Sequence, residues 1–119
     1  MIKKRYIYDN SKINIGDIFY SSWGYDQTNI DYYKVKKLIG KASVELVPIE
    51  SRIDYDKSNA YTDAVVPYPA SEGTPMQKKI KYAVWDDYKE PRIKMNTYAN
   101  AYPWDGQPKM QTNPYCARS

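Results

Sequence analysis

Apolar and polar residues alternate in short stretches along this chain, and each stretch has the length of one β-strand. Residues 31–39 and 42–49 are rich in β-branched and aromatic side chains, and they flank a tight pair at 40–41 that begins with glycine. Glycine at the first central position of a two-residue turn suits the type II′ conformation. The pattern therefore predicts an antiparallel hairpin with its turn at 40–41.

The alternation within this hairpin also predicts which side chains face the core. Side chains two residues apart share one face of a strand, so Val44 and Leu46 should lie inside. Lys34 and Lys36 of the partner strand should then be exposed. Pro48 cannot donate a hydrogen bond to a neighbouring strand. The second strand should therefore end at Pro48 or lie at an edge of the sheet.

Further strands and loops follow from the same pattern. The strands are expected at 13–23, 62–66, 77–85 and 92–98. The loops are expected at 50–60 and 67–76, which are rich in turn-forming residues. In the strand at 77–85, Ile80, Tyr82 and Val84 alternate with Lys79 and Lys81. One face of this strand should therefore be buried and the other exposed.

These elements predict the fold class. No window keeps apolar residues at positions i, i+3, i+4 and i+7, which argues against a long helix. Five or six short strands with intervening turns instead predict a mainly β, single-domain protein over residues 1–119, built as a small barrel or roll, with an SH3-like barrel preferred. Residues 99–119 contain three prolines and little periodicity. They should form an irregular tail that packs on the barrel through Tyr102 and Trp104.

Composition narrows the chemistry that such a domain can perform. The chain has no histidine and a single cysteine, Cys116, which excludes histidine-dependent triads, zinc sites and an internal disulfide. Its five glycines are never spaced as in phosphate-binding loops. We therefore assign no catalytic residue, metal or cofactor and expect a protein that is not an enzyme. A carboxylate-based enzyme is the least favoured alternative, because no pair stands out among Asp26, Asp31, Asp86, Asp87 and Asp105.

Tyrosine is the main aromatic residue, since the chain has 14 Tyr, three Trp and one Phe. A buried tyrosine needs a hydrogen-bond partner for its hydroxyl, so many of these rings should lie half-buried with the phenol at the surface. Such a surface is typical of binding faces, and it could also hold copies of the chain together as an oligomer. The alternative is that a barrel-like fold simply favours tyrosine.

The net charge of +4 and the pI of about 9.0 are compatible with a polyanionic partner. The first 60 residues carry ten basic and eight acidic side chains and the rest carry eight and six, so no basic tail exists. A set of lysines would form a basic face for nucleic acid if the hairpin and the strand at 77–85 are neighbours, with Lys36, Lys37 and Lys79 as its main contacts. The other members of the set are Lys34, Lys41, Lys78 and Lys81. The alternative is that these lysines are only the solvated side of strands. Neither a membrane-spanning run nor a signal peptide is visible, so we expect a cytoplasmic protein without a membrane partner.

The densest group of hydrogen-bonding and stacking side chains is the 23–29 loop, between the first strand and the hairpin. Trp23 and Tyr25 would stack on a base or another planar group, while polar neighbours would hydrogen-bond its edge. These neighbours are Asp26, Gln27, Thr28 and Asn29. Alternatively, the segment is an ordered loop whose polar side chains bond to nearby backbone. Trp104, in a turn near the end of the chain, would either cap the core or complete the ligand site.

The stretches SSWGYDQTN at 21–29 and YPWDG at 102–106, together with GDI at 16–18 and DYY at 31–33, resemble a family of small uncharacterised proteins. The members of that family belong to phages, plasmids and other mobile elements. The resemblance covers most of the chain and implies no activity, substrate or catalytic residue. It implies a context, because small proteins of mobile elements often bind nucleic acid or block a host defence system.

The sequence thus leaves two main hypotheses. The first is a non-enzymatic binding protein of a phage or mobile element that works in the host cytoplasm. It would engage nucleic acid, or a host defence complex that handles nucleic acid, through the 23–29 loop and nearby lysines. The alternative is a small-molecule binder that sequesters a nucleotide-like ligand between this loop and Trp104. Salt dependence separates them, because a site that neutralises several phosphates weakens steeply as salt rises.

Overall fold

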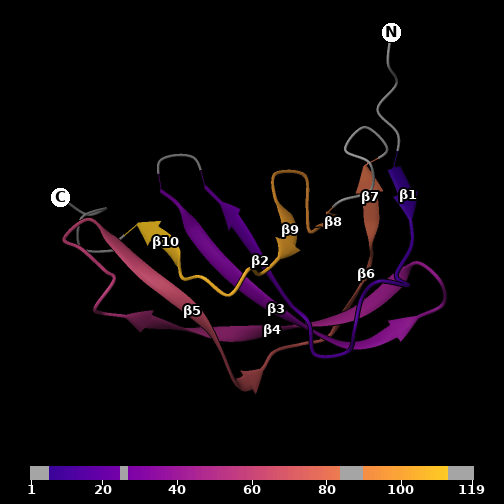
Figure 1. The fold of residues 1–119 in the computed structure, drawn as a ribbon, viewed down its shortest axis with the longest axis horizontal. Coiled ribbons are helices and arrows are strands. Elements are labelled where there is room, and N and C mark those ends of the chain that lie inside the picture. Colours follow the sequence, from indigo (N-terminus) through magenta and orange to yellow (C-terminus); the bar gives the residue numbers. More distant parts are fainter. Residues whose placement is uncertain (1–5, 25–26, 84–89, 113–119) are drawn as a thin grey trace, which may run out of the picture.

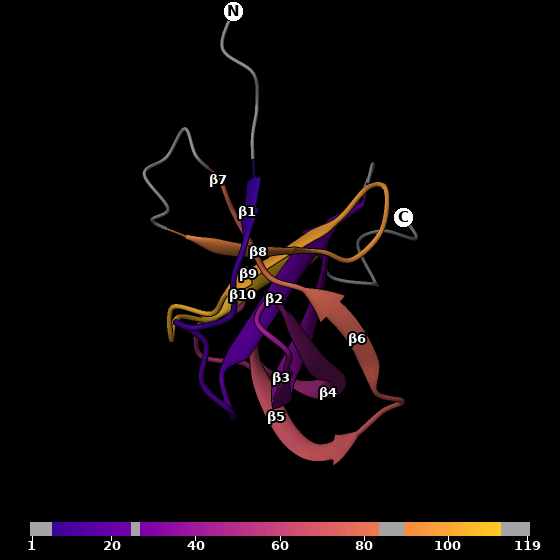
Figure 2. The same cartoon turned by 90° about the vertical axis from the view of Figure 1, so that its right-hand side faces the viewer.

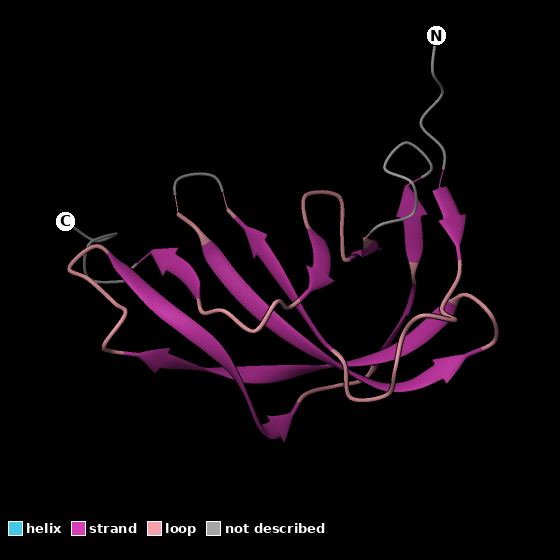
Figure 3. Ribbon diagram, in the orientation of Figure 1, coloured by secondary structure: helices cyan, strands magenta, loops and turns pink. Residues whose placement is uncertain are grey.

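A computed structural model describes residues 6–24, 27–83 and 90–112 of the chain. Within these residues it contains ten β-strands and no helix (Figures 1 and 3). The strands are β1 (Tyr6–Tyr8), β2 (Ile18–Trp23), β3 (Asn29–Ile39), β4 (Ser43–Asp54), β5 (Thr62–Glu72), β6 (Met76–Lys79), β7 (Lys81–Ala83), β8 (Pro91–Lys94), β9 (Asn100–Pro103) and β10 (Lys109–Thr112). No helix that could cross a bilayer is found in this part of the chain.

The ten strands form one antiparallel sheet. Its order is β1-β7-β8-β9-β2-β3-β4-β5-β10, and β6 pairs with β4 beside this path (Figure 1). The prediction of a mainly β fold is confirmed. The SH3-like closed barrel is not confirmed, because the sheet stays open, with β1 at one end and β10 at the other in the described part of the chain.

Burial of the central strands on both faces explains why the sheet does not close. On β3, Val35 packs in one apolar cluster and Tyr32 packs in another. Odd and even residues of a strand point to opposite sides, so the clusters lie on opposite faces, which we call the Val35 face and the Tyr32 face. β7, β8 and β9 contribute to the first cluster, and β5 contributes to the second. The two ends of the sheet therefore cover opposite faces of the same strands, and Figure 2 shows β1, β7, β8 and β9 above and β5 below.

The predicted hairpin is confirmed as β3 and β4. Their register pairs Ile39 with Ser43, so the turn contains residues 40–42 and is one residue longer than expected. Gly40 has a φ of 58°, in the left-handed region that glycine adopts without steric cost. Val44 and Leu46 are fully buried. Lys36 is exposed and Lys34 is half-buried, so neither lies in the core.

Pro48 lies inside β4, which corrects the expectation that the strand ends there or lies at an edge. β4 continues to Asp54, with β3 on one side and β5 and β6 on the other. On this second side the partner changes from β6, which pairs up to Leu46, to β5, which pairs from Ile49. The Pro48 carbonyl accepts a hydrogen bond from the Gly73 N–H on that side. The nitrogen and the carbonyl of one strand residue point to the same side of the strand. The Pro48 nitrogen, which carries no hydrogen to donate, therefore faces the place where β4 changes partner from β6 to β5.

The expected loop at 50–60 contains the end of β4, which extends to Asp54, and two further segments that were expected to be irregular also contain strands. β5 extends to Glu72 and so includes most of the expected loop at 67–76. The expected tail at 99–119 contains β9, which lies between β8 and β2, and β10, which pairs with β5. Residues 113–119 lie outside the described part. Both segments are rich in proline, and pairing with distant strands outweighs their weak local preference for strand.

The strand expected at 77–85 is interrupted in the middle. Ile80 and Tyr82 are buried, as the alternation predicts, and Val84 lies outside the described residues. The interruption at Ile80 lets β6 pair with β4, whereas β7 pairs with β1 and β8. One short stretch of sequence therefore joins two distant parts of the sheet.

Candidate functional site

The 23–29 loop is built around Gly24. This glycine has a φ of 126°, and a Cβ at its position would overlap the backbone oxygen of Gln27, so only glycine fits the close approach. The Asn29 side-chain amide donates a hydrogen bond to the Trp23 carbonyl at 3.4 Å. Asn29 thus contributes to the architecture of the loop, as the structural alternative for this segment predicts.

The structure brings together only part of the predicted loop site. Tyr25 and Asp26 lie outside the described residues. The Thr28 N–H donates to the Thr112 hydroxyl at 2.8 Å, and the Thr112 N–H donates to the Thr28 carbonyl at 2.9 Å. These bonds anchor the loop to the end of β10. Gln27 is exposed and is the described loop residue that remains most available to a partner.

Trp23 lies near the surface on the Val35 face. Its Nε1–H donates to Asp31 Oδ2 at 2.6 Å, and its ring centroid lies 5.8 Å from that of Tyr98. Tyr98 is 68% exposed. Tyr33 is on the same face of β3, where burial and then the charge of Asp31 raise the pKa of its hydroxyl. Three aromatic residues and Asp31 thus form a partly exposed patch on the Val35 face.

Trp104 lies on the Tyr32 face instead. Its ring packs edge-on against Tyr32, with centroids 6.1 Å apart, and its Nε1–H donates to the Gln107 carbonyl at 2.7 Å. Residues at the start of β2 help to line a hollow of about 230 Å³ beside Trp104, and Trp23 does not line it. The two tryptophans therefore lie on opposite faces of the sheet, and the structure does not bring them together around one ligand.

The predicted lysine face is interrupted by acidic residues. The hairpin and β6 are neighbours, as this prediction requires, since β4 pairs with β6. Lys37 forms an ion pair with Glu45 at 3.5 Å, and Lys36 forms one with Glu72 at 3.1 Å. The positive charge of both lysines is therefore largely balanced. Lys79, on β6, has no such acidic partner among the described residues.

A row of side chains that the sequence analysis did not single out crosses five neighbouring strands. Tyr8 of β1 lies opposite Lys81 of β7, which lies opposite Arg92 of β8. The Arg92 guanidinium lies 5.7 Å from the centre of the Tyr102 ring on β9, and Tyr102 lies opposite Tyr20 of β2. We call these five residues the cross-strand row. Directly paired residues share a face, and Tyr20 packs against the second cluster, so the row continues the Tyr32 face.

Further cations lie over tyrosine rings within and beside the row. The pairs are Lys81 over Tyr6, with Nζ 4.2 Å from the ring centroid, Lys79 over Tyr8 at 5.5 Å, and Lys109 over Tyr20 at 4.4 Å. All three distances are within the range of cation–π attraction. Lys109 also forms an ion pair with Asp105 at 3.1 Å, so the row is closer to neutral at its Tyr20 end.

Positive charges are crowded at the centre of the row. Lys81 and Arg92 are directly opposed, and Lys94 follows on the same side of β8. Burial, and then the charges of Lys94 and Arg92, lower the pKa of Lys81. Like charges directly opposed across a sheet destabilise it. The neighbouring cations therefore disfavour the charged form of Lys81.

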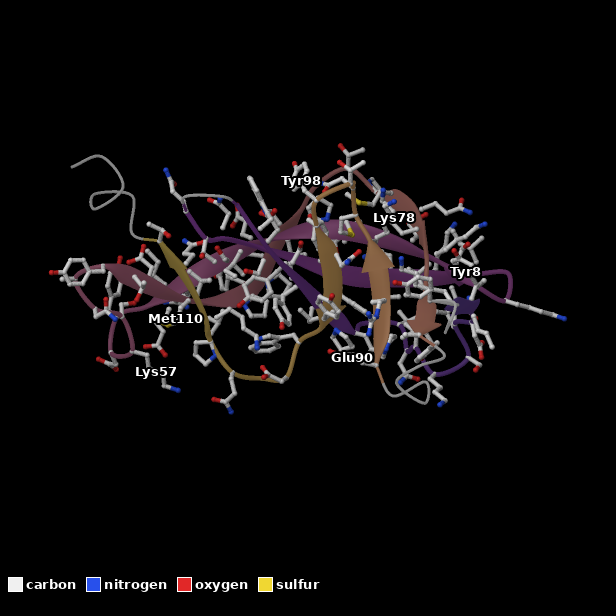
Figure 4. The ribbon with its side chains drawn as sticks, turned by 90° about the horizontal axis from the view of Figure 1, so that it is seen from above. Tyr8, Lys57, Lys78, Glu90, Tyr98 and Met110 are labelled. Carbon is white, nitrogen blue, oxygen red and sulfur yellow. The ribbon has the colours of Figure 1, made fainter. Side chains whose placement is uncertain are left out.

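Basic and acidic side chains are concentrated in different regions of the fold, although the two halves of the sequence carry similar net charges. In the sequence, residues 76–103 contain six basic side chains and three acidic, whereas residues 50–72 contain two basic and five acidic. Figure 4 shows Tyr8, beside the basic strands, at the opposite end of the molecule from Lys57 in the acidic region. A sequence window shorter than half the chain could have found this asymmetry. The cross-strand row itself depends on strand order and register.

Neither a metal centre nor a known relative guides the choice of site. In the described residues, no group of three or more Cys, Asp and Glu side chains could hold a metal ion. Comparisons of the chain with protein-family models, with curated proteins and with solved structures found no match. The choice therefore depends on the geometry and charge of the chain itself, which favour the cross-strand row.

Proposed function

We propose that this protein binds nucleic acid without catalysing a reaction, and that the cross-strand row is its binding surface. The proposal rests on one observation, the alignment of two cations between tyrosines in one row across β1, β7, β8, β9 and β2. Cations neutralise backbone phosphates, and aromatic rings stack on bases. A surface that presents both in one row suits nucleic acid better than it suits a neutral or cationic partner.

The arrangement of the charges favours a polyanion over a single small anion. Lys81 and Arg92 lie on neighbouring strands, Lys94 lies two residues after Arg92 on the same side of β8, and Lys79 lies beside Tyr8. One small anion would relieve the repulsion between two of these groups at most. A chain of phosphates contacts all of them, and each neutralised phosphate releases counterions that favour binding.

The proposed context is a phage or another mobile element, as the resemblance at 21–29 and 102–106 implies. Such a protein would act in the host cytoplasm, on nucleic acid itself or on a host defence complex that handles it. The row supports either case, because a protein that covers nucleic acid competes with a defence complex for the same strand. The nucleotide-sequestering alternative is less favoured, since Trp23 and Trp104 lie on opposite faces.

The test is the salt dependence of binding to a fluorescently labelled oligonucleotide, measured by anisotropy between about 50 and 200 mM salt. The variants are Lys94→Gln, the double variant Lys81→Gln/Lys94→Gln, and Lys57→Gln as the control. Each lost phosphate contact should lower the slope of log affinity against log salt by about 0.7 to 0.9. Affinity should fall for all sequences alike, because phosphates carry no sequence information. Circular dichroism and thermal melts check that each variant is folded.

Three results would contradict the proposal. The first is binding of the double variant with wild-type affinity and slope. The second is absence of binding by the wild-type protein at about 50 mM salt. The third is a variant Lys36→Gln/Lys37→Gln that lowers the slope while Lys81→Gln/Lys94→Gln does not. That result would move the binding surface to Lys36 and Lys37 of β3, whose acidic partners Glu72 and Glu45 lie on β5 and β4.

A further inference from the structure

The tyrosines of the row are spaced differently from the bases of a duplex. Neighbouring strands lie about 4.8 Å apart, so Tyr8 and Tyr102, three strands apart, are separated by about 14 Å. Tyr6 and Tyr8 share one side of β1 at about 6.8 Å, the rise of two strand residues. Bases along one strand of a duplex are about 3.4 Å apart, and their faces are covered by neighbouring bases. A ring on this sheet can therefore receive a base only from a strand that is open and extended.

We infer that the nucleic acid bound at the cross-strand row is single-stranded, with bases stacked on Tyr8 and its neighbours. The inference rests on the proposed function and specifies its substrate class. Unpaired strands can turn their bases outward onto aromatic side chains, as proteins that bind single strands require. The described residues also contain no helix that could enter a major groove.

The exposure of the tyrosines on β1 supports a role for their rings. Tyr8 is 51% exposed and Tyr6 is 36% exposed. The ammonium groups of Lys79 and Lys81 lie over one face of these two rings, so a base stacks on the other face and has a positive charge nearby for its phosphate. A duplex would use the lysines alone, through its backbone. Only a single strand uses both the rings and the charges.

The experiment compares an oligothymidylate of about 16 nucleotides, the upper site size of many single-strand binders, with a duplex of the same length. The variant is Tyr8→Leu, which keeps apolar bulk and removes the ring. Its control is Tyr61→Leu, because Tyr61 is 73% exposed and lies in the acidic β4–β5 turn, which joins two strands outside the row. Tyr8→Trp tests rescue. All four proteins are measured at several salt concentrations.

We expect the wild-type protein to bind the single strand at least tenfold more tightly than the duplex. Tyr8→Leu should weaken single-strand binding on the order of tenfold, the usual loss for one stacked base. The salt slope should be unchanged, since no charge is removed, and Tyr8→Trp should restore affinity. Tyr61→Leu should bind as wild type.

The failures of the inference and of the proposed function can be told apart. Equal binding of both oligonucleotides, with Tyr8→Leu unchanged and Lys81→Gln/Lys94→Gln weakened, would refute the single-strand inference and leave nucleic-acid binding standing. Preference for the duplex would refute the inference in the same way. If neither oligonucleotide binds, both are wrong. An equal loss in Tyr61→Leu would also refute the inference, because the effect would not be specific to the row.

Discussion

Replacing Trp104 and Trp23 separately by alanine measures how much each side chain contributes to the stability of the fold. Trp104 packs edge-on against Tyr32 and donates a hydrogen bond to the Gln107 carbonyl. Loss of the ring pair should cost about 0.5–1.5 kcal/mol, loss of the hydrogen bond about 1 kcal/mol, and loss of half-buried apolar area about 1–2 kcal/mol. Trp104→Ala should therefore lower the free energy of unfolding by about 3–4 kcal/mol, which agrees with the usual cost of such a truncation.

Trp23→Ala is the matched control. Its ring partner Tyr98 is 68% exposed and its hydrogen-bond partner Asp31 is exposed, so water replaces much of what is lost and the cost should be about 1 kcal/mol. In thermal melts at about 4 °C per kcal/mol, Trp104→Ala should lower Tm by about 12–16 °C and Trp23→Ala by about 4 °C. Similar losses in the two variants would refute the assignment of Trp104 to the core and Trp23 to the surface.

Two further predictions concern Tyr32 and the 23–29 loop. Tyr32→Phe should lower the free energy of unfolding by about 1–3 kcal/mol, because the buried hydroxyl donates to the Val65 carbonyl at 2.6 Å; urea unfolding that shows no loss would contradict this. Burial raises the pKa of Tyr32 from 10.0 to about 12, so the folded protein holds this proton more tightly than the unfolded chain does. The free energy of unfolding should therefore fall as the pH rises from about 10 to about 12, and it should fall further in the wild type than in Tyr32→Phe. Gly24→Ala should lower the free energy of unfolding by at least about 1 kcal/mol, because φ is 126° and the new Cβ would overlap Gln27. Gln27→Ala should lower it by less than about 0.5 kcal/mol. Equal melting temperatures for these two variants would contradict the prediction, because they would show that the loop relaxes around the new Cβ.

The sequence by itself determined the features that depend on neighbouring residues. Alternation predicted strands and argued against a long helix, and it placed Val44 and Leu46 in the core, as the described residues confirm. Gly40 predicted the position of the hairpin turn, because a positive φ is a local requirement. The loop at 23–29 was recognisable from its composition, although its function stays a prediction. Each of these inferences needs only a few consecutive residues.

Only the tertiary structure decided the features that depend on which strands meet. Pro48 remains inside β4 because the partner strand changes beside it, and β9 forms between β8 and β2 although its own sequence favours strand weakly. The open sheet follows from two clusters on opposite faces of β3, which no single strand reveals.

The cross-strand row is the clearest case of a feature decided by tertiary structure. Tyr8, Lys81, Arg92, Tyr102 and Tyr20 are scattered over most of the sequence. They form one surface because register sets which residues of distant strands lie opposite each other. A shift of one residue in any of these pairings would turn the side chains of that strand to the other face. The residue types were therefore visible in the sequence, but their assembly into a binding surface required the long-range pairing of the folded sheet.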